Sequence, residues 1–240
     1  TYDLKRGKDL VAWIDGKPRD EQKQKDKPIA ELLGVTQLPT DQRKRFIMDA
    51  TFKLDTSLLI RSGSGEADSP DMVHLKSKGK PILSGTSLAG AIRARALRIV
   101  KTVGADERLV ETVFGSKAQN EKNGKKKNLK ASRAVVRETE IKDGYERVQS
   151  RVKIDRFTGG SFPTALFDQQ PIFGGKDTKV NVWVELRDPK EQHIGLLLHI
   201  LKDLWTGDLP LGGEASVGRG RLKGESASLV FYEGGENKRS

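Results

Sequence analysis

The sequence predicts an α+β fold of the ferredoxin-like kind, in which two helices cover one face of an antiparallel sheet. Two kinds of periodicity support this prediction. Apolar residues alternate with polar ones in Arg45–Leu54 and Lys179–Asp188, as in half-buried strands. They recur at spacings of three and four in Ser84–Gly104 and after Pro189, as in amphipathic helices. The predicted order is strand, helix, strands, strand, helix, strand, which fits this fold.

The first 45 residues predict an N-terminal arm or linker. Gly16–Lys27 is charged and poor in apolar residues, so we expect solvated chain there. A short apolar group before it is able to dock on another surface: Leu10, Val11, Trp13 and Ile14. The strand Arg45–Leu54 continues into Ser57–Ile60, and a polar loop, Arg61–Pro70, follows.

The first long helix is predicted over Ser84–Gly104. Thr86 or Ser87 is expected to cap its N-terminus, and Gly104 its C-terminus. Its apolar face consists of Leu88, Ile92, Ala96, Ile99 and Val103. A basic stripe on the same helix is either a solvated face or a binding surface: Arg95, Arg98 and Lys101.

The middle of the chain mixes strands and loops. Ser116–Lys130 is lysine-rich with almost no apolar residues, which predicts a mobile loop. Ser132–Ile141 and Val148–Ile154 have the composition of strands. Phe157–Gly175 is rich in glycine and proline and is predicted to be a loop, whose many apolar side chains either pack or bind.

The last part of the chain contains the strongest helix signal. This helix begins at Pro189 and ends at Gly207, with an apolar face formed by Ile194, Leu197, Leu198, Leu201, Leu204 and Trp205. A glycine-rich loop, Gly212–Gly220, comes next. Further strands are predicted at Leu222 and over Ser226–Tyr232.

Composition narrows the function classes. The net charge of +11, from 44 Lys and Arg against 33 Asp and Glu, favours a polyanionic partner, although a basic but unspecialised protein also fits. The absence of cysteine excludes a disulfide framework and a cysteine zinc site. No long apolar run or signal peptide is present, so we expect a cytoplasmic protein without a membrane partner. We expect one domain over residues 46–232 and a tail over 233–240; because the chain starts at Thr1, it is either trimmed or one module of a longer polypeptide.

The glycine-rich loop is a candidate phosphate site. It contains four glycines and one arginine, and a second arginine follows it: Gly212, Gly213, Gly218, Gly220, Arg219 and Arg221. A backbone nest with nearby arginines suits phosphate, but a plain turn between a helix and a strand also fits. No Gly-Lys-Ser/Thr sequence follows, so the loop is not a P-loop.

An acidic loop is the candidate for catalysis. Gly63–Asp71 contains the carboxylates Glu66, Asp68 and Asp71. Such a cluster binds a divalent ion, acts as a general base, or is only a solvated acidic turn. The histidines lack the spacing of a zinc site or a two-histidine ribonuclease centre: His74, His193 and His199.

Four stretches occur in a fixed order: Ala67–Pro70, Gly85–Arg93, Val152–Arg156, and Gly212–Gly220 with Arg221 behind it. In this combination the chain resembles the RAMP superfamily of CRISPR-associated proteins, and within it the repeated backbone subunits of type III effectors. The resemblance covers Phe46–Tyr232. It departs from the family pattern at Ala89, where a lysine is common.

The resemblance implies a modified RNA-recognition-motif core with an inserted β-hairpin, the thumb, over residues 157–172. Its apolar side chains would wedge into the guide–target duplex: Phe162, Leu166 or Phe167. The resemblance also implies that Asp68 is catalytic and transiently holds Mg²⁺ or Mn²⁺, with Glu66 and Asp71 as supporting carboxylates. RNA contacts are expected from Ser87, Arg93, Arg95, Arg133, Arg156, Arg219 and Arg221 and from the glycine-rich loop.

The implied function is that of a backbone subunit that holds guide RNA and cleaves the paired target RNA, beside neighbouring effector subunits or fused backbone modules. Aromatic residues make up only 6% of the chain, which argues against a standard RNA-recognition motif that stacks bases on its sheet. Alternatives are a non-catalytic scaffold and a guide-processing endonuclease, although the helix Thr86–Val103 has no histidine for the latter. A basic structural protein such as a ribosomal component fits the four motifs poorly.

Overall fold

The computed structural model describes residues 5–15, 34, 42–63, 69–116, 129–233 and 236–239. The chain divides into two compact units, Thr1–Asp41 and Gln42–Ser240. The described part of the first unit contains helix α1 (Gly7–Ile14), which buries none of its residues. Its four large apolar side chains, from Leu10 to Ile14, are exposed. They are therefore accessible, and their docking on another surface stays a prediction.

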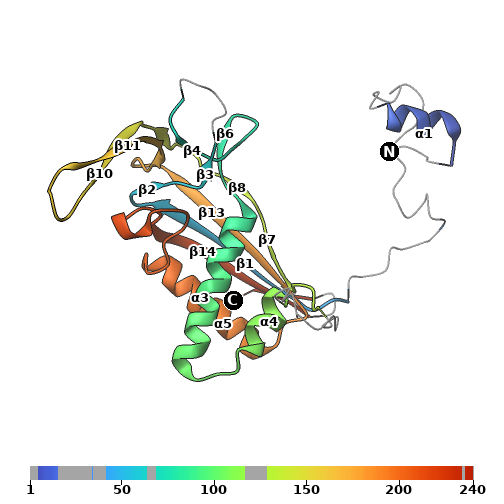
Figure 1. Ribbon diagram of the computed structural model, residues 1–240. Helices are drawn as coiled ribbons and strands as arrows, with labels where there is room; N and C mark the ends of the chain where they lie inside the picture. Colours follow the sequence, from blue (N-terminus) through green and yellow to red (C-terminus); the bar gives the residue numbers. More distant parts are fainter. Residues whose placement is uncertain are drawn as a thin grey trace, which may run out of the picture. The chain divides into compact units, whose positions relative to one another are not determined.

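The centre of the second unit is a five-stranded antiparallel sheet (Figure 1). Its strands lie in the order β15 (Glu236–Arg239), β14 (Leu222–Glu233), β1 (Arg45–Leu54), β13 (Lys179–Arg187) and β7 (Ala134–Val136). The predicted alternation in β1 and β13 is confirmed, because alternate side chains of both strands are buried. A strand buried on one face needs this period of two, since successive side chains point to opposite faces. The predicted α+β class is confirmed.

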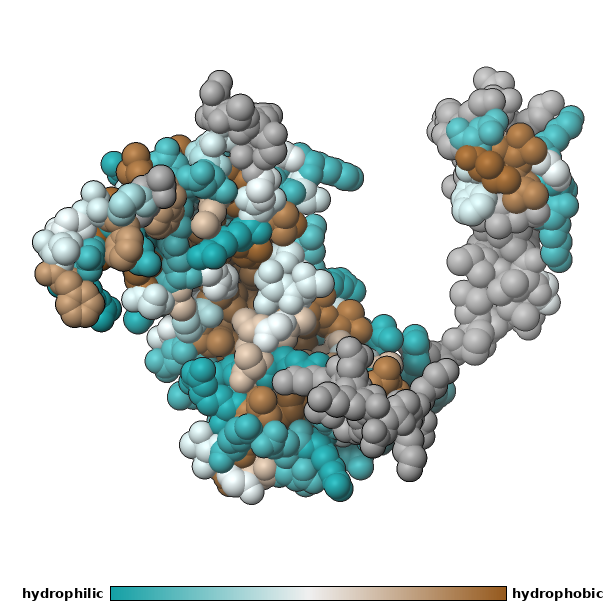
Figure 2. Space-filling model, in the orientation of Figure 1, coloured by the Kyte–Doolittle hydropathy of each residue, from teal (hydrophilic) through white to brown (hydrophobic). Residues whose placement is uncertain are grey.

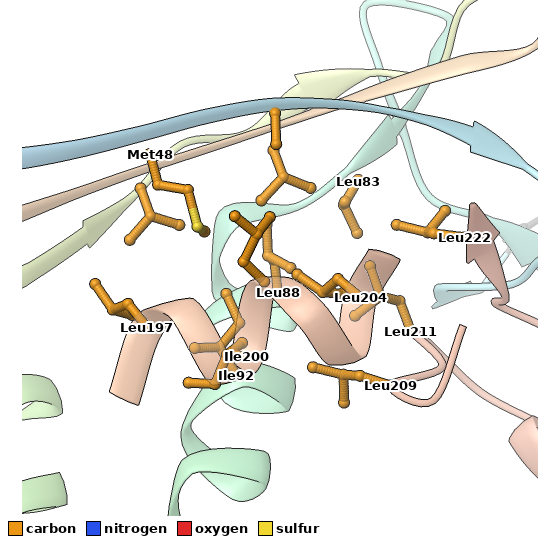
Figure 3. Packing of buried hydrophobic residues seen from close by; sticks show 14 of the residues in the cluster. Met48, Leu83, Leu88, Ile92, Leu197, Ile200, Leu204, Leu209, Leu211 and Leu222 are labelled. Atoms are coloured by element: carbon orange, nitrogen blue, oxygen red, sulfur yellow. The ribbon is translucent and has the colours of Figure 1, made fainter. Parts of the chain in front are cut away.

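Two long helices, α3 (Gly85–Val103) and α5 (Glu191–Trp205), cover one face of this sheet, and the short helix α4 (Arg108–Phe114) follows α3 (Figure 1). Side chains of α3 and α5 meet beneath the sheet, where Leu88 and Ile92 lie near Leu197 and Ile200 (Figure 3). All four side chains are fully buried, so this contact lies at the centre of the apolar core.

The ends of these helices differ in part from the prediction. Ser84, not Thr86 or Ser87, caps α3: its Oγ accepts a 3.2 Å hydrogen bond from the backbone N–H of Ser87. Ser84 has the extended backbone that an N-cap requires, whereas the two predicted residues already lie inside the helix. The C-terminal cap at Gly104 is confirmed, with φ of 71°.

A β-hairpin projects from the second unit and is formed by β10 (Gln149–Ile154) and β11 (Ser161–Gln170) (Figure 1). The prediction of a loop over Phe157–Gly175 was therefore wrong for most of that segment. The glycines gather at the turn and beyond the end of β11, which leaves a strand between them. Pro163 lies where the register between the two strands shifts, and such an irregularity tolerates proline.

Short strands connect the hairpin to the rest of the unit. β11 pairs in parallel with β4 (Met72–His74), which pairs with β3 (Arg61–Ser62). The other short strands are β2 (Ser57–Leu58), β5 (Lys76–Ser77), β6 (Lys80–Leu83), β8 (Thr139–Glu140), β9 (Tyr145–Glu146) and β12 (Ile172–Phe173), and one 3₁₀ turn, η1, spans Ala215–Val217. None of the helices in the described ranges is both long and apolar enough to cross a membrane.

Candidate nucleic-acid interface

The tip of the hairpin is organised by one aspartate. The side chain of Asp155 accepts hydrogen bonds from the Phe157 N–H, at 3.0 Å, and from the Thr158 hydroxyl, at 3.1 Å. Its backbone N–H donates to the Gly160 carbonyl at 2.8 Å. An aspartate that bonds to the backbone two residues ahead is a typical turn former. The turn leaves Arg156 exposed and Phe157 98% exposed.

Exposed apolar side chains continue along the hairpin from this tip (Figure 2). Val152 and Leu166 lie directly opposite each other on the two strands, and both are exposed. Phe162 is 43% exposed, and the Lys153 ammonium lies 4.7 Å from the centre of its ring. Soluble domains seldom display such a group without a binding role.

The structure divides the three predicted wedge residues between two faces of the hairpin. Leu166 and Phe162 are exposed, whereas Phe167 is half-buried and pairs with Arg151 on the face opposite to that of Leu166. The sequence analysis did not name Phe157 or Val152 as wedge residues. Two features of the sequence could have indicated them. One is the turn signal in Asp155-Arg-Phe-Thr-Gly-Gly160, and the other is the spacing of two residues between Val152 and Ile154, which is typical of one face of a strand.

The glycine-rich loop packs tightly against neighbouring backbone. Gly212 has φ of 75° and a side chain there would collide with the carbonyl of Leu59. Gly220 has φ of 77° and a side chain there would collide with the carbonyl of Leu211. The N–H of Gly220 donates to the Ser57 carbonyl at 2.6 Å. Close backbone approach therefore explains these two glycines.

Arg219, in the same loop, is only 3% exposed and is surrounded by acceptors. Its Nε donates to Glu214 Oε2 at 2.8 Å and its Nη1 to Ser57 Oγ at 2.9 Å. Its Nη2 donates to Gln149 Oε1 at 2.7 Å and to Gln169 Oε1 at 3.3 Å. The amide of Gln169 also donates to the carboxylate of Glu214. Burial alone would raise the pKa of Glu214, but the hydrogen bonds from Gln169 and Arg219 lower it overall.

Two residues of α3 that were expected to contact RNA, Ser87 and Arg93, form hydrogen bonds within the protein. The Ser87 hydroxyl accepts a 2.9 Å hydrogen bond from the Ser84 hydroxyl. The Arg93 guanidinium donates to the carbonyl oxygens of Phe114 and Gly115, at 3.3 Å and 2.9 Å, at the end of α4. Gly85, in the same motif, lies so close to the Val136 carbonyl that a side chain there would crowd it.

The other predicted arginines differ in their surroundings. Arg95 forms a 2.6 Å ion pair with Asp203, which joins α3 to α5. Arg133 forms a 3.0 Å ion pair with Asp188, and the side chain of Arg133 is 37% exposed. Arg221 is exposed beside the buried Arg219. Arg156 and Arg221 are therefore the predicted arginines that are most accessible to a ligand.

The acidic loop is described only at its ends, because Glu66 and Asp68 lie outside the described residues. Asp71 is exposed, and its Oδ2 accepts a 2.8 Å hydrogen bond from the backbone N–H of Asp168 on β11. Asp168 Oδ1 is buried without a hydrogen-bond partner among the described groups. Among the described residues, no group of three His, Cys, Asp or Glu could hold a metal ion. Nothing in the sequence pattern placed Asp168 next to this loop.

The comparisons with known proteins agree with this architecture. The family model of the RAMP superfamily matches residues 51–223. The chain shares its fold with a chain of the type III-B Cmr-beta structure, solved by cryo-EM in the apo state, with a TM-score of 0.52 and 13% identity. That match covers 78% of this chain and 98% of the other. No curated protein matches. The chain therefore belongs to the RAMP superfamily, in keeping with the order of its motifs.

Proposed function

We propose that the chain is a backbone subunit of a type III CRISPR effector, which holds guide RNA and cleaves the target RNA paired with it in the cytoplasm. The observation that most directly supports this proposal is the projecting β10–β11 hairpin, whose tip presents the 98% exposed ring of Phe157. Family membership and the fold shared with the type III-B Cmr-beta chain support the proposal. In this proposal the five-stranded sheet with α3 and α5 is the ferredoxin-like, modified RNA-recognition-motif core. The hairpin is the thumb, and it includes β10 (Gln149–Ile154), which lies before the expected residues 157–172. Neighbouring effector subunits, or fused backbone modules, are the protein partners.

Guide RNA would be held by its phosphates. A subunit that accepts any guide must contact phosphates and 2′-hydroxyls, because base edges differ from guide to guide. The net charge of +11 and the exposed Arg156 and Arg221 suit that task. We expect the affinities for two unrelated RNAs to be alike and to fall steeply as salt rises. A flat salt response or a strong sequence preference would contradict this.

The hairpin would interrupt the guide–target duplex. An exposed aromatic tip backed by Val152 and Leu166 offers an apolar wedge on which a displaced base can stack. Opening a base step frees the backbone next to it. The adjacent 2′-hydroxyl can then reach an in-line position relative to the phosphorus, which is a positioning effect.

Cleavage would proceed by attack of this 2′-hydroxyl oxygen on the adjacent phosphorus. The Asp68 carboxylate would accept the hydroxyl proton, the new P–O bond would close a cyclic phosphate, and the 5′ oxygen would leave and take up a proton. Asp71 lies at the end of the same loop as Asp68, and Asp168 on β11 bonds to Asp71 through its backbone N–H. Carboxylate oxygens such as those of Asp71 and the unpaired Oδ1 of Asp168 are the donors that Mg²⁺ or Mn²⁺ prefers. A divalent ion held there would stabilise negative charge on the phosphorane.

The test separates binding from cleavage in the assembled complex. Asp68→Ala should lower the cleavage rate by about 10²–10⁴-fold, the usual contribution of positioned proton transfer, and leave target affinity unchanged. Asp177→Ala, in the turn before β13, is the matched control for loss of a carboxylate. Near wild-type cleavage by Asp68→Ala would refute the assignment and make Glu66 or Asp71 the next candidate. A joint fall in binding and cleavage would mean that Asp68 is structural. If the unmodified complex never cuts at this subunit, the chain is a scaffold.

A further inference from the structure

We infer that Arg219 is a positioning residue, which sets the direction in which the β10–β11 hairpin projects from the domain. The inference rests on the proposed function in one respect: the direction of the hairpin matters for function because the hairpin is proposed to enter an RNA duplex. Gln149 and Gln169 lie opposite each other at the base of the hairpin, and both accept hydrogen bonds from Nη2 of Arg219. One nitrogen atom therefore holds both strands of the hairpin where they leave the domain.

The remaining nitrogens of Arg219 hold the parts from which the hairpin projects. Nη1 bonds to Ser57 on β2, directly after the central strand β1, and Nε bonds to Glu214 in the glycine-rich loop. A guanidinium is planar, and its donors have fixed directions, so bonds to several elements fix an orientation as well as a distance. A lysine in the same place could not reproduce that geometry, because its ammonium is a point charge on a flexible stem.

The backbone pairing between the hairpin and β4 is short. β11 pairs with β4 through two residue pairs, Gln169 with Met72 and Gln170 with Val73. From Gln149 to the tip the strand rises by roughly 3.3 Å per residue, or about 20 Å. A rotation of about 10° at the base would therefore move the tip by about 3 Å, close to the spacing between stacked bases. The base of the hairpin thus decides which nucleotide the tip meets.

Because Arg219 is buried, it is not accessible as an RNA contact. A buried guanidinium is tolerated only when its charge is compensated and its donors are bonded. Glu214 supplies the charge, and Arg151 and Arg61 also lie near its carboxylate, at 3.7 Å and 3.8 Å. Arg221 is exposed beside this cluster, and the Arg61 side chain is 55% exposed although it pairs with Glu214, so both are accessible to phosphate, whereas Arg219 is 3% exposed.

The first test measures the hairpin in the full chain without RNA. Arg219→Met should raise hydrogen–deuterium exchange of the β10–β11 amides at least about tenfold, because several hydrogen bonds to a charged group are lost. Arg219→Lys should restore little of the protection. Asp203→Ala is the matched control, because it breaks the ion pair between Arg95 on α3 and Asp203 on α5, away from the hairpin. When the exchange of the hairpin amides is normalised to that of β1 and β13, this variant should match the wild type.

If Arg219→Met prevents folding, Gln149→Met keeps the inference testable, since it removes one hairpin acceptor and leaves the bonds to Ser57 and Glu214. It should raise hairpin exchange in the same residues, although less. Equal exchange in all variants, or an equal rise in the Asp203→Ala control, would overturn the inference.

The second test places the tip on RNA. 2-Aminopurine is introduced at successive positions of a guide–target duplex bound to the chain, and its emission rises where a base is unstacked. Wild-type protein should give one bright position, and Arg219→Met should spread the emission over neighbouring positions. A merely stabilising residue would weaken the signal without spreading it, and that result would overturn the inference. If the duplex bound to wild-type protein shows no bright position, the proposed wedge is refuted. The exchange experiment then still decides the role of Arg219.

Discussion

The guanidinium of Arg93 donates a 2.9 Å hydrogen bond to the carbonyl oxygen of Gly115, 22 residues further along the chain. Gly115 ends helix α4, and the last carbonyls of a helix lack partners within it and carry partial negative charge. Arg93 therefore ties α3 to the end of α4. The family resemblance implies that this arginine faces guide RNA, whereas its hydrogen bonds point to the protein backbone.

Arg93→Met should lower the free energy of unfolding by about 1.5–3 kcal/mol, the range for hydrogen bonds that involve a charged group. It should leave the salt dependence of RNA affinity unchanged. Arg221→Met is the comparison: this exposed side chain should contribute little to stability, and its loss should lower the salt slope by about one phosphate contact. Urea unfolding and affinity measured across a salt series test both. A reduced slope in Arg93→Met would show that this arginine also meets phosphate.

The glycines of the loop should differ in their tolerance of a side chain. Gly220→Ala should destabilise by about 3 kcal/mol or more, because a methyl group would collide with the Leu211 carbonyl on a left-handed backbone. Gly218→Ala is the matched control, since Gly218 has φ of 87° but open space around it. Only the left-handed strain applies there, about 1–2 kcal/mol. Equal losses in thermal or urea unfolding would contradict the packing argument.

His74 is buried between backbone groups of two segments, Leu58–Ile60 and β6. Its Nε2 lies 2.9 Å from the Ile82 carbonyl oxygen, and its Nδ1 lies 3.0 Å from that of Leu58 and accepts from the Ile60 N–H at 3.2 Å. Burial lowers the pKa of His74, although the two carbonyls oppose this effect. At a pH just below the ordinary histidine pKa, His74 therefore binds a proton more readily in the unfolded chain than in the native state.

Stability should be highest above pH 6.5 and should fall as the pH is lowered from 6.5 toward the depressed pKa of His74. His193 acts in the same direction, because burial and then Arg133 lower its pKa. His74→Gln should reduce the slope of unfolding free energy against pH, and a second change, His193→Gln, should reduce it further. Urea midpoints at several pH values above 5 test this, and an unchanged slope in the double variant would contradict it.

The tip of the hairpin should matter for RNA and not for folding. Phe157→Ala should change the free energy of unfolding by no more than about 0.5 kcal/mol, because the ring is 98% exposed. It should abolish the bright 2-aminopurine position in the bound duplex. Val103→Ala, at the end of α3, also removes an exposed apolar side chain and should leave that signal intact. Full emission from Phe157→Ala would assign the wedge to another residue.

Local pattern was sufficient to predict much of this molecule. Alternation located β1 and β13, because a sheet covered on one face needs a period of two, and the spacing of leucines located α5. The order of four short motifs indicated the family, which the match over residues 51–223 confirmed. These features depend on neighbours in the chain, so the sequence displays them directly.

The partners of the charged residues were decided only by the tertiary structure. Arg219 and its partner Ser57 are 162 residues apart, and Arg95 and Asp203 are 108 residues apart. An arginine in a glycine-rich loop has the same local sequence whether it faces phosphate or a buried carboxylate. Only the packing of the loop on β2 and the hairpin removes it from solvent. The sequence alone thus determined the long strands β1 and β13, the two long helices and the family, whereas the three-dimensional contacts determined that Arg219 bonds to the hairpin and that Arg221 stays exposed.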